Sequence, residues 1–232
     1  MKDWMKMAQK PQPPAVPTIY LLRHGKTKFN TDGSTPDRIR GWEDVPLDET
    51  GKEQAEDVGQ FFKGRHIDAI FTSDLSRCRD VAEEISKATG VPVTAASKKF
   101  RPWNLGSFQG QNSRMVAEQI KEKYIEEPDL AVPNGESFNS FERRYLSTLR
   151  RLMSALVDGD YKAIVIVAHY RNLKISEAWA ALGCRDALSK SVFLSDDTDP
   201  ASIVELQYRN HKWEGHKLDD TGVEPSHEKD KE

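Results

Sequence analysis

Two histidines of this chain each stand beside an arginine at the end of an apolar stretch. Arg23 and His24 end the stretch TIYLLRH, and His169 ends AIVIVAH, with Arg171 two residues further on. Packing at a strand end needs neither a cation nor an imidazole, so these residues indicate a phosphate-handling site, with an ordinary surface turn as the alternative. A neutral imidazole attacks phosphorus, and arginines hold the phosphoryl oxygens through bidentate, charge-assisted bonds. The set predicts phosphoryl transfer, with a second imidazole adding positive charge in the transition state.

The elements that must position these residues alternate between short apolar strands and longer amphipathic helices. Strands are expected at residues 18–23, 67–73, 91–96, 162–169 and 201–210, and helices at residues 48–62, 75–90, 113–124, 137–159 and 172–183. Asp48 or Thr50 is expected to cap the first helix, and Gly90 to end the second. The alternation predicts an α/β fold with a mainly parallel central sheet covered on both faces. The most hydrophobic strand, 162–169, should be central, and 201–210 should be a late edge strand.

Folds of this class bind ligands at the carboxyl ends of their strands. Those ends carry Arg23 and His24, then Ser73, Asp74 and Arg77, then His169 and Arg171. We therefore expect two histidines and several arginines to meet in one pocket.

Composition limits the class of protein. The chain has 232 residues, 37% of them hydrophobic and 31% charged, which suits one globular domain with a sizeable core. We expect a flexible proline-rich arm at residues 1–17, the folded domain at 18–215 and a disordered charged tail at 216–232. A formal net charge of -3 does not suggest a general nucleic-acid binder. No apolar run is long enough to span a bilayer and the N-terminus is not that of a signal peptide, so the expected location is cytoplasmic. Composition does not predict the oligomeric state.

The cysteines and histidines do not have the spacing of a metal site. Cys78 and Cys184 stand far apart and are expected to be half-buried free thiols in a reducing compartment. The six histidines form no His-Glu-x-x-His motif and no close His/Cys cluster, so no zinc site and no cofactor are expected.

Five segments, in order, resemble motifs of the histidine phosphatase superfamily, also called the phosphoglycerate mutase-like family. These segments are RHGKTKFN, IRGWEDVPLDETGKEQA, TSDLSRCRDVA, NGESFNSFERR and VIVAHYRNLK. Each motif alone is weak to moderate, but together they extend from about Thr18 to about Leu206. The resemblance implies a three-layer α/β/α sandwich and a phosphorylated small-molecule substrate.

The resemblance also implies a role for each site residue. His24 is similar to the nucleophile that becomes phosphohistidine, and Arg23, Arg77 and His169 resemble the rest of the phosphate pocket. Asn30 and Thr27 match positions that touch phosphate or substrate, although either could simply cap a turn.

The chain departs from the family pattern where the general acid is usually found. The segment FRPWNLGSFQG places Pro102 at the acid position and Gln109 at that of a second glutamate. Proline donates no proton, and general acid catalysis typically contributes about 10² to 10⁴ in rate. Glu136 is the best substitute acid, although a structural role is the alternative. In AHYRN, Arg171 replaces a glycine and would either bind substrate or form a surface salt bridge.

Three functions remain open from these residues. The first is a metal-independent phosphatase of the histidine acid type, acting through phospho-His24. The second is a catalytically weakened protein that binds a phosphate ligand, as Pro102 suggests. The third is a phosphoglycerate mutase, which the chain resembles less. Two basic features are expected to be solvated charges only: Arg101, and the arginines of ERRYLSTLRR on the exposed side of an amphipathic helix.

Overall fold

Six strands form one sheet in the computed structural model, which describes residues 12–30, 36–181 and 199–218. The strands are β1 (Thr18–Arg23), β2 (Ala69–Ser73), β3 (Val93–Ser97), β4 (Ala163–Ala168), β5 (Ile203–Arg209) and β6 (Lys212–Leu218). Their order is β3-β2-β4-β1-β5-β6. The first four pair in parallel, whereas β5 and β6 are antiparallel to their neighbours. The predicted mainly parallel sheet is confirmed, with β4 in its interior.

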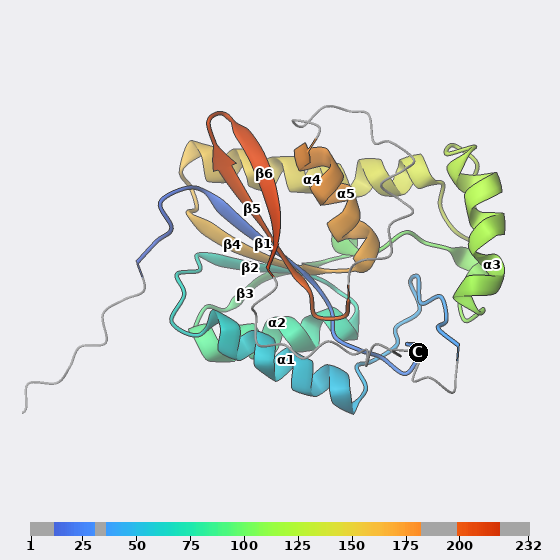
Figure 1. The fold of residues 1–232 in the computed structure, drawn as a ribbon, viewed down its shortest axis with the longest axis horizontal. Coiled ribbons are helices and arrows are strands. Elements are labelled where there is room, and N and C mark those ends of the chain that lie inside the picture. The colour runs from blue at the N-terminus through green and yellow to red at the C-terminus, as the bar shows by residue number, and fades with distance from the viewer. Residues whose placement is uncertain (1–11, 31–35, 182–198, 219–232) are drawn as a thin grey trace, which may run out of the picture.

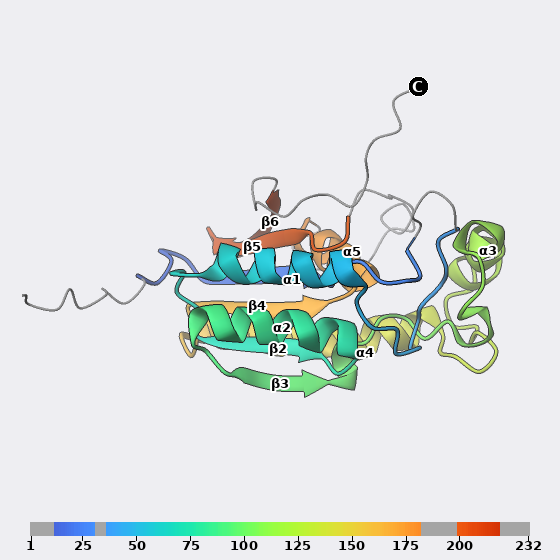
Figure 2. The ribbon, with the colours of Figure 1, turned by 90° about the horizontal axis from the view of Figure 1, so that it is seen from below.

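Helices cover both faces of this sheet (Figures 1 and 2). They are α1 (Glu49–Phe62), α2 (Ser76–Thr89), α3 (Ser113–Ile120), α4 (Phe138–Asp158) and α5 (Tyr170–Ala181), with the short 3₁₀ helices η1 (Lys98–Phe100) and η2 (Gly106–Phe108) and the π-helical segment η3 (Lys121–Ile125). In Figure 2, α1 and α2 lie in front of the strands, with α4 and α5 behind them. The predicted three-layer α/β/α sandwich is therefore confirmed.

The side-chain alternation of β1 shows how the two core layers form. Ile19 and Leu21 pack into the cluster shared with α4 and α5, whereas Tyr20 and Leu22 pack into the cluster shared with α1 and α2. All four are buried, as expected for a strand with helices on both faces.

Local signals set the ends of the two helices on the first face. The Asp48 side chain accepts a hydrogen bond from the backbone N–H of Gly51 at 2.8 Å, so Asp48 caps α1. Gly90 ends α2 in the left-handed conformation at φ 76°.

The strand predicted at the sheet edge lies inside the sheet instead. β5 pairs with β1 on one side and with β6 on the other. Asn210 and His211 both have positive φ, 49° and 63°, and form the two-residue turn that returns the chain as β6. The prediction that residues 201–210 form an edge strand was wrong, because β6 contains no apolar run from which a further strand could be predicted.

The ordered structure also extends past both predicted boundaries of the domain. β6 continues to Leu218, three residues into the tail predicted from residue 216. Pro17, in the predicted arm, accepts a hydrogen bond through its carbonyl from Tyr208 N at 3.0 Å. Residues 1–11 and 219–232 lie outside the described part of the chain. No described helix combines the length and the hydropathy needed to cross a bilayer.

Candidate active site

The two predicted histidines lie side by side because the strands that precede them are neighbours. Arg23 at the end of β1 is in register with Ala168 at the end of β4. The next residues, His24 and His169, therefore leave the sheet at the same edge, with ring centroids 5.2 Å apart and an interplanar angle of 66°. Both are 3% exposed, so the pair is nearly closed off from water.

The surroundings of His24 suit a nucleophile. Its Nδ1 lies 2.7 Å from the carbonyl oxygen of Gly25. A carbonyl only accepts, so Nδ1 carries the proton and Nε2 keeps its lone pair. Burial, followed by the positive charges of Arg77 and Arg23, holds the pKa of His24 well below its usual value. The ring is therefore neutral at physiological pH.

His169 is neutral for the same reasons. Burial lowers its pKa most, and the largest charged influence is again Arg77. Cys78 lies on its other side, with Sγ 3.5 Å from Nε2 of His169 and 3.3 Å from the carbonyl oxygen of Ala168. Cys78 is a free thiol, as predicted, but it is fully buried rather than half-buried, and burial raises its pKa to about 12, so it is protonated and unreactive. The other cysteine, Cys184, lies outside the described residues.

Arg77 is placed by the first turn of α2 and is fully buried. Its two terminal nitrogens donate to the carbonyls of Glu43 and Gly41 at 2.8 and 3.0 Å. Its Nε is buried and has no hydrogen-bond partner within the described residues. Burial lowers the pKa of this guanidinium to about 10, which leaves it charged. A buried cation with unused N–H donors is what a phosphate oxygen requires.

The predicted residues Arg23 and Arg171 share a contact with one ring. The guanidinium carbons of Arg23 and Arg171 lie 5.5 and 5.1 Å from the centroid of the Tyr170 ring. Burial and repulsion by Arg40 lower the pKa of Arg23 to about 10. Tyr170, in place of a family glycine, thus lies against both Arg23 and Arg171.

Thr27 and Asn30 are bound to each other and to an arginine that sequence reasoning missed. Asn30 Oδ1 accepts from the N–H and the hydroxyl of Thr27 at 2.9 and 3.2 Å. Arg40 Nε donates to Thr27 Oγ1 at 2.8 Å, and Arg40 Nη2 pairs with Asp37 at 3.1 Å. Arg40 is among the three largest charged influences on His24. The available signal was its position three residues after Asp37, inside the second family-like segment.

Glu136 is held by a second missed arginine. Arg144 Nη2 donates to Glu136 Oε1 at 2.7 Å, and Asn104 N donates to the same oxygen at 3.0 Å. No hydrogen bond or ion pair within the described residues joins Glu136 to either histidine. Its carboxylate holds the loop that leads to α4, and its partner Arg144 contributes to the lowered pKa of His169.

The prediction that the arginines of ERRYLSTLRR are solvated charges was wrong for Arg144, which lies in α4. Its side chain is 19% exposed and donates to the carbonyls of Lys98, Lys99, Arg101 and Pro102 at 3.0 to 3.1 Å. One guanidinium therefore fixes the whole segment that contains the family's acid position. The helical spacing of Leu146, Leu149 and Leu152 did not indicate these partners, which lie more than 40 residues away in the chain.

The prediction that Arg101 is a solvated charge was also wrong. Arg101 forms a two-pronged ion pair with Asp74, at 2.7 and 2.8 Å, and lies over the Trp42 ring at 4.8 Å. Trp42 in turn donates its indole N–H to the carbonyl of Pro102 at 2.9 Å. Gln109, at the second lost glutamate position, accepts from the backbone N–H of Trp42. These contacts hold the segment around Pro102 in place, so Arg101 and Trp42 have structural partners in this segment.

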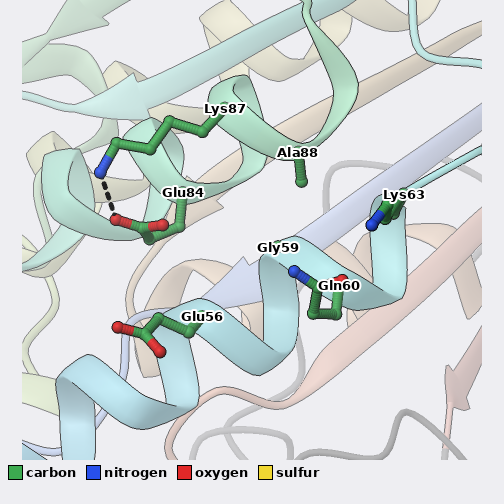
Figure 3. Close-up of a pocket in the computed structure, with 7 residues that line it drawn as sticks. All are labelled: Glu56, Gly59, Gln60, Lys63, Glu84, Lys87 and Ala88. Carbon is green, nitrogen blue, oxygen red and sulfur yellow. Dashed lines mark hydrogen bonds and ion pairs between the residues drawn. The ribbon is translucent and has the colours of Figure 1, made fainter.

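A groove of the described surface lies elsewhere, between α1 and α2 (Figure 3). Its walls carry Glu56, Gln60, Lys63, Glu84 and Lys87, with Lys87 paired to Glu84 at 2.6 Å. It holds neither histidine of the pair, and its charged groups are ordinary helix-surface residues. No group of three or more His, Cys, Asp or Glu within the described ranges is arranged to hold a metal ion.

Comparison with known sequences gives results consistent with this geometry. The profile of the histidine phosphatase superfamily (branch 1) matches residues 19–221. The chain is 33% identical over 135 residues to the probable phosphoglycerate mutase GpmB of Photorhabdus laumondii, which covers 56% of this chain and 60% of that protein. It is 30% identical over 151 residues to the "Uncharacterized phosphatase PhoE" of Bacillus subtilis (strain 168), covering 65% of this chain and 70% of that one.

Solved structures show the same fold. Bacillus stearothermophilus YhfR superimposes with a TM-score of 0.69 at 24% identity, covering 90% of this chain and 99% of that one. A mycobacterial glucosyl-3-phosphoglycerate phosphatase superimposes with a TM-score of 0.68 at 22% identity, covering 87% and 97%. The ordered motifs, the paired histidines and the profile that spans nearly the whole described domain agree: the chain belongs to the histidine phosphatase superfamily.

Proposed function

We propose that this protein is a metal-independent phosphatase that hydrolyses small phosphorylated molecules through a phosphohistidine on His24. The observation that carries the proposal is a neutral His24, with its Nε2 lone pair free, beside His169 and under the charges of Arg77 and Arg23. Relatives and structural neighbours named as phosphatases support it. A cytoplasmic location, and the absence of nucleic-acid and membrane partners, stay predictions.

The reaction has two steps. Nε2 of His24 attacks phosphorus, the bond from phosphorus to the ester oxygen breaks, and the leaving group departs with that electron pair. The arginines neutralise the phosphoryl oxygens, and His169 hydrogen-bonds to the transferring group. A water molecule then attacks the phosphohistidine, the N–P bond breaks, and inorganic phosphate leaves with His24 neutral again.

The proposed reaction lacks an evident general acid to protonate the leaving group. Pro102 cannot donate a proton, and its carbonyl is occupied by the N–H groups of Trp42 and Arg144. Glu136 is held by Arg144 at 2.7 Å and by the backbone N–H of Asn104 at 3.0 Å, and no hydrogen bond within the described residues joins it to either histidine. We therefore propose that the substrates have weakly basic leaving groups, such as aryl or acyl phosphates.

Two other functions have support in specific observations. The loss of an acid at Pro102 favours a protein that binds a phosphate ligand with little turnover. The similarity to proteins named probable phosphoglycerate mutase favours a mutase, which would return the phosphoryl group to its product. A coupled mutase assay distinguishes the mutase from the phosphatase, because only the mutase forms the isomeric phosphate ester.

The deciding experiment is hydrolysis of p-nitrophenyl phosphate in the presence of EDTA. We expect turnover in the wild type and in His216→Ala, a control at an exposed histidine of β6, and none in His24→Ala. Ordinary turnover by His24→Ala would refute the phosphohistidine mechanism. Absence of turnover in every protein, with inorganic phosphate still bound, would instead support the binding function.

A further inference from the structure

A third arginine, Arg40, is bonded to the loop that follows His24 and adjoins Arg77: its Nε donates to Thr27 Oγ1 at 2.8 Å, and the carbonyl of the next residue, Gly41, accepts from Arg77 Nη2 at 3.0 Å. Arg77, Arg23 and Arg40 are, in that order, the largest charged influences on His24. Arg40 comes from the loop before α1 and its side chain is only 12% exposed. The sequence prediction assigned the phosphate to Arg23 and Arg77 and gave Arg40 no role.

These cations repel one another at close range. Arg40 is the largest repulsive influence on Arg23 and on Arg77, and after burial it does most to lower the pKa of Arg23 to about 10. The carboxylate that pairs directly with Arg40 is Asp37, while Asp48, Asp199 and Asp44 act on Arg40, Arg23 and Arg77 without a described ion pair to them, and the positive charge of Arg101 also acts on Arg77. The three guanidiniums and Asp37 together carry two positive charges, and both histidines are neutral. A doubly charged anion would balance this set.

Arg40 keeps donors available for such an anion. A guanidinium has five N–H groups. Those of Arg40 make three hydrogen bonds, to Thr27 Oγ1 at 2.8 Å, Asp37 Oδ1 at 3.1 Å and the Arg38 carbonyl at 3.3 Å. Arg77 is fully buried with an Nε that has no hydrogen-bond partner among the described residues. Two arginines whose charges both act on His24 therefore have unused donors.

The loop that carries Arg40 is fastened to the body of the domain. The carbonyl of Asp37 accepts a hydrogen bond from Ser113 N at 2.8 Å. Ile39 N donates to the carbonyl of Gln111 at 2.9 Å, and the carbonyl of Ile39 accepts from Gly110 N at 2.7 Å. Thr27, which receives Arg40 Nε, is fully buried. The guanidinium is thus held in place before any ligand binds, which reduces the entropy lost on binding.

We propose that Arg40 is a third phosphate-binding arginine of this site and that it makes the site selective for the phosphate dianion over the monoanion. The inference rests on the proposed function only in taking phosphate as the ligand. It does not depend on turnover. His24 and His169 add no positive charge to that of the arginines, because the pKa of each lies well below its usual value.

The test is calorimetric titration of the full chain with inorganic phosphate at pH 8, where the dianion dominates, and at pH 5.5, where the monoanion does. The variant is Arg40→Met and the matched control is Arg38→Met, at the exposed arginine two residues earlier. We expect Arg40→Met to bind phosphate about 10- to 100-fold more weakly than the control at pH 8, the size of one charge-assisted contact. The difference at pH 5.5 should be smaller.

A conservative variant separates binding from folding. Arg40→Lys keeps the charge but not the fork of donors, so it should bind phosphate with intermediate affinity and retain part of the preference for pH 8. Thermal unfolding without phosphate shows whether each variant is folded. Folded Arg40→Met that binds phosphate as tightly as Arg38→Met at both pH values would overturn the inference. A wild type that binds no phosphate would overturn both the inference and the proposed function, whereas the preceding outcome leaves the proposed function intact.

Discussion

Cys78 Sγ lies 3.5 Å from Nε2 of His169. The thiol fills the space between α2 and the end of β4 and is fully buried. Its raised pKa, about 12, results mainly from burial, so the native thiol is protonated. The position supports His169 by packing and contributes no nucleophile.

This contact predicts the reactivity of the thiol. In a Cys184→Ser background, we expect native protein at pH 8 to resist a thiol reagent, because Cys78 is both protonated and inaccessible. Labelling should appear only as urea unfolds the chain, following the loss of circular dichroism. Stoichiometric labelling of the native protein within minutes would contradict the burial of Cys78.

The substitution at the acid position predicts a steep dependence on the leaving group. We expect the wild type to hydrolyse p-nitrophenyl phosphate about 10² to 10⁴ times faster than an alkyl phosphate, the range that general acid catalysis spans. Pro102→Glu should narrow that gap by accelerating the alkyl substrate alone. Pro102→Gln, which offers no acid, is the matched control. Equal rates of the wild type on both substrates would show that another residue donates the proton.

The low pKa of the two histidines predicts how stability changes with pH. In the unfolded chain each imidazole titrates near its usual value, whereas in the folded chain His24 and His169 remain neutral to a lower pH. Below about pH 6.5 the unfolded state binds more protons, so stability falls as pH decreases through that window. Urea unfolding at pH 7.5 and pH 5 should show a smaller loss in His169→Asn than in the wild type. The control His216→Ala should behave like the wild type, and an equal loss in all three proteins would argue against this origin.

The hydrogen bonds of Arg144 predict that this residue stabilises the fold. Arg144→Met removes one guanidinium from four carbonyls and Glu136, and we expect it to reduce the free energy of unfolding by about 2 to 4 kcal/mol. The exposed neighbour Arg143→Met should change it by less than about 0.5 kcal/mol. Denaturant titration measures both. Similar stability of the two variants would show that the hydrogen bonds of Arg144 contribute little.

The position of Glu136 leads to a separate prediction on catalysis. Glu136→Gln keeps the shape of the side chain and an oxygen that accepts from Asn104 N, but it removes the carboxyl group. If Glu136 only positions its loop, kcat for an alkyl phosphate should fall less than about tenfold. A loss of about 10² or more on the alkyl substrate, with none on p-nitrophenyl phosphate, would identify Glu136 as the acid.

The sequence by itself determined the features that depend on neighbouring residues. The apolar runs before His24 and His169 predicted two buried strands, and their shared edge predicted that the histidines meet. Asp48 and Gly90 marked helix ends because capping involves residues within one turn. The ordered motifs predicted the family that the profile then showed.

Tertiary structure alone decided which charged side chains belong to the interior. Arg101 and Arg144 have the composition of solvated charges, yet their partners stand 27 and up to 46 residues away in the chain. Arg40 acts on His24 only because the loop before α1 is bonded to the segment before α3. The sheet position of β5 was likewise set by its pairing with β6. A sequence pattern shows where a side chain leaves its own helix or strand, but the partner that stabilises a buried charge is fixed only when distant segments pack together.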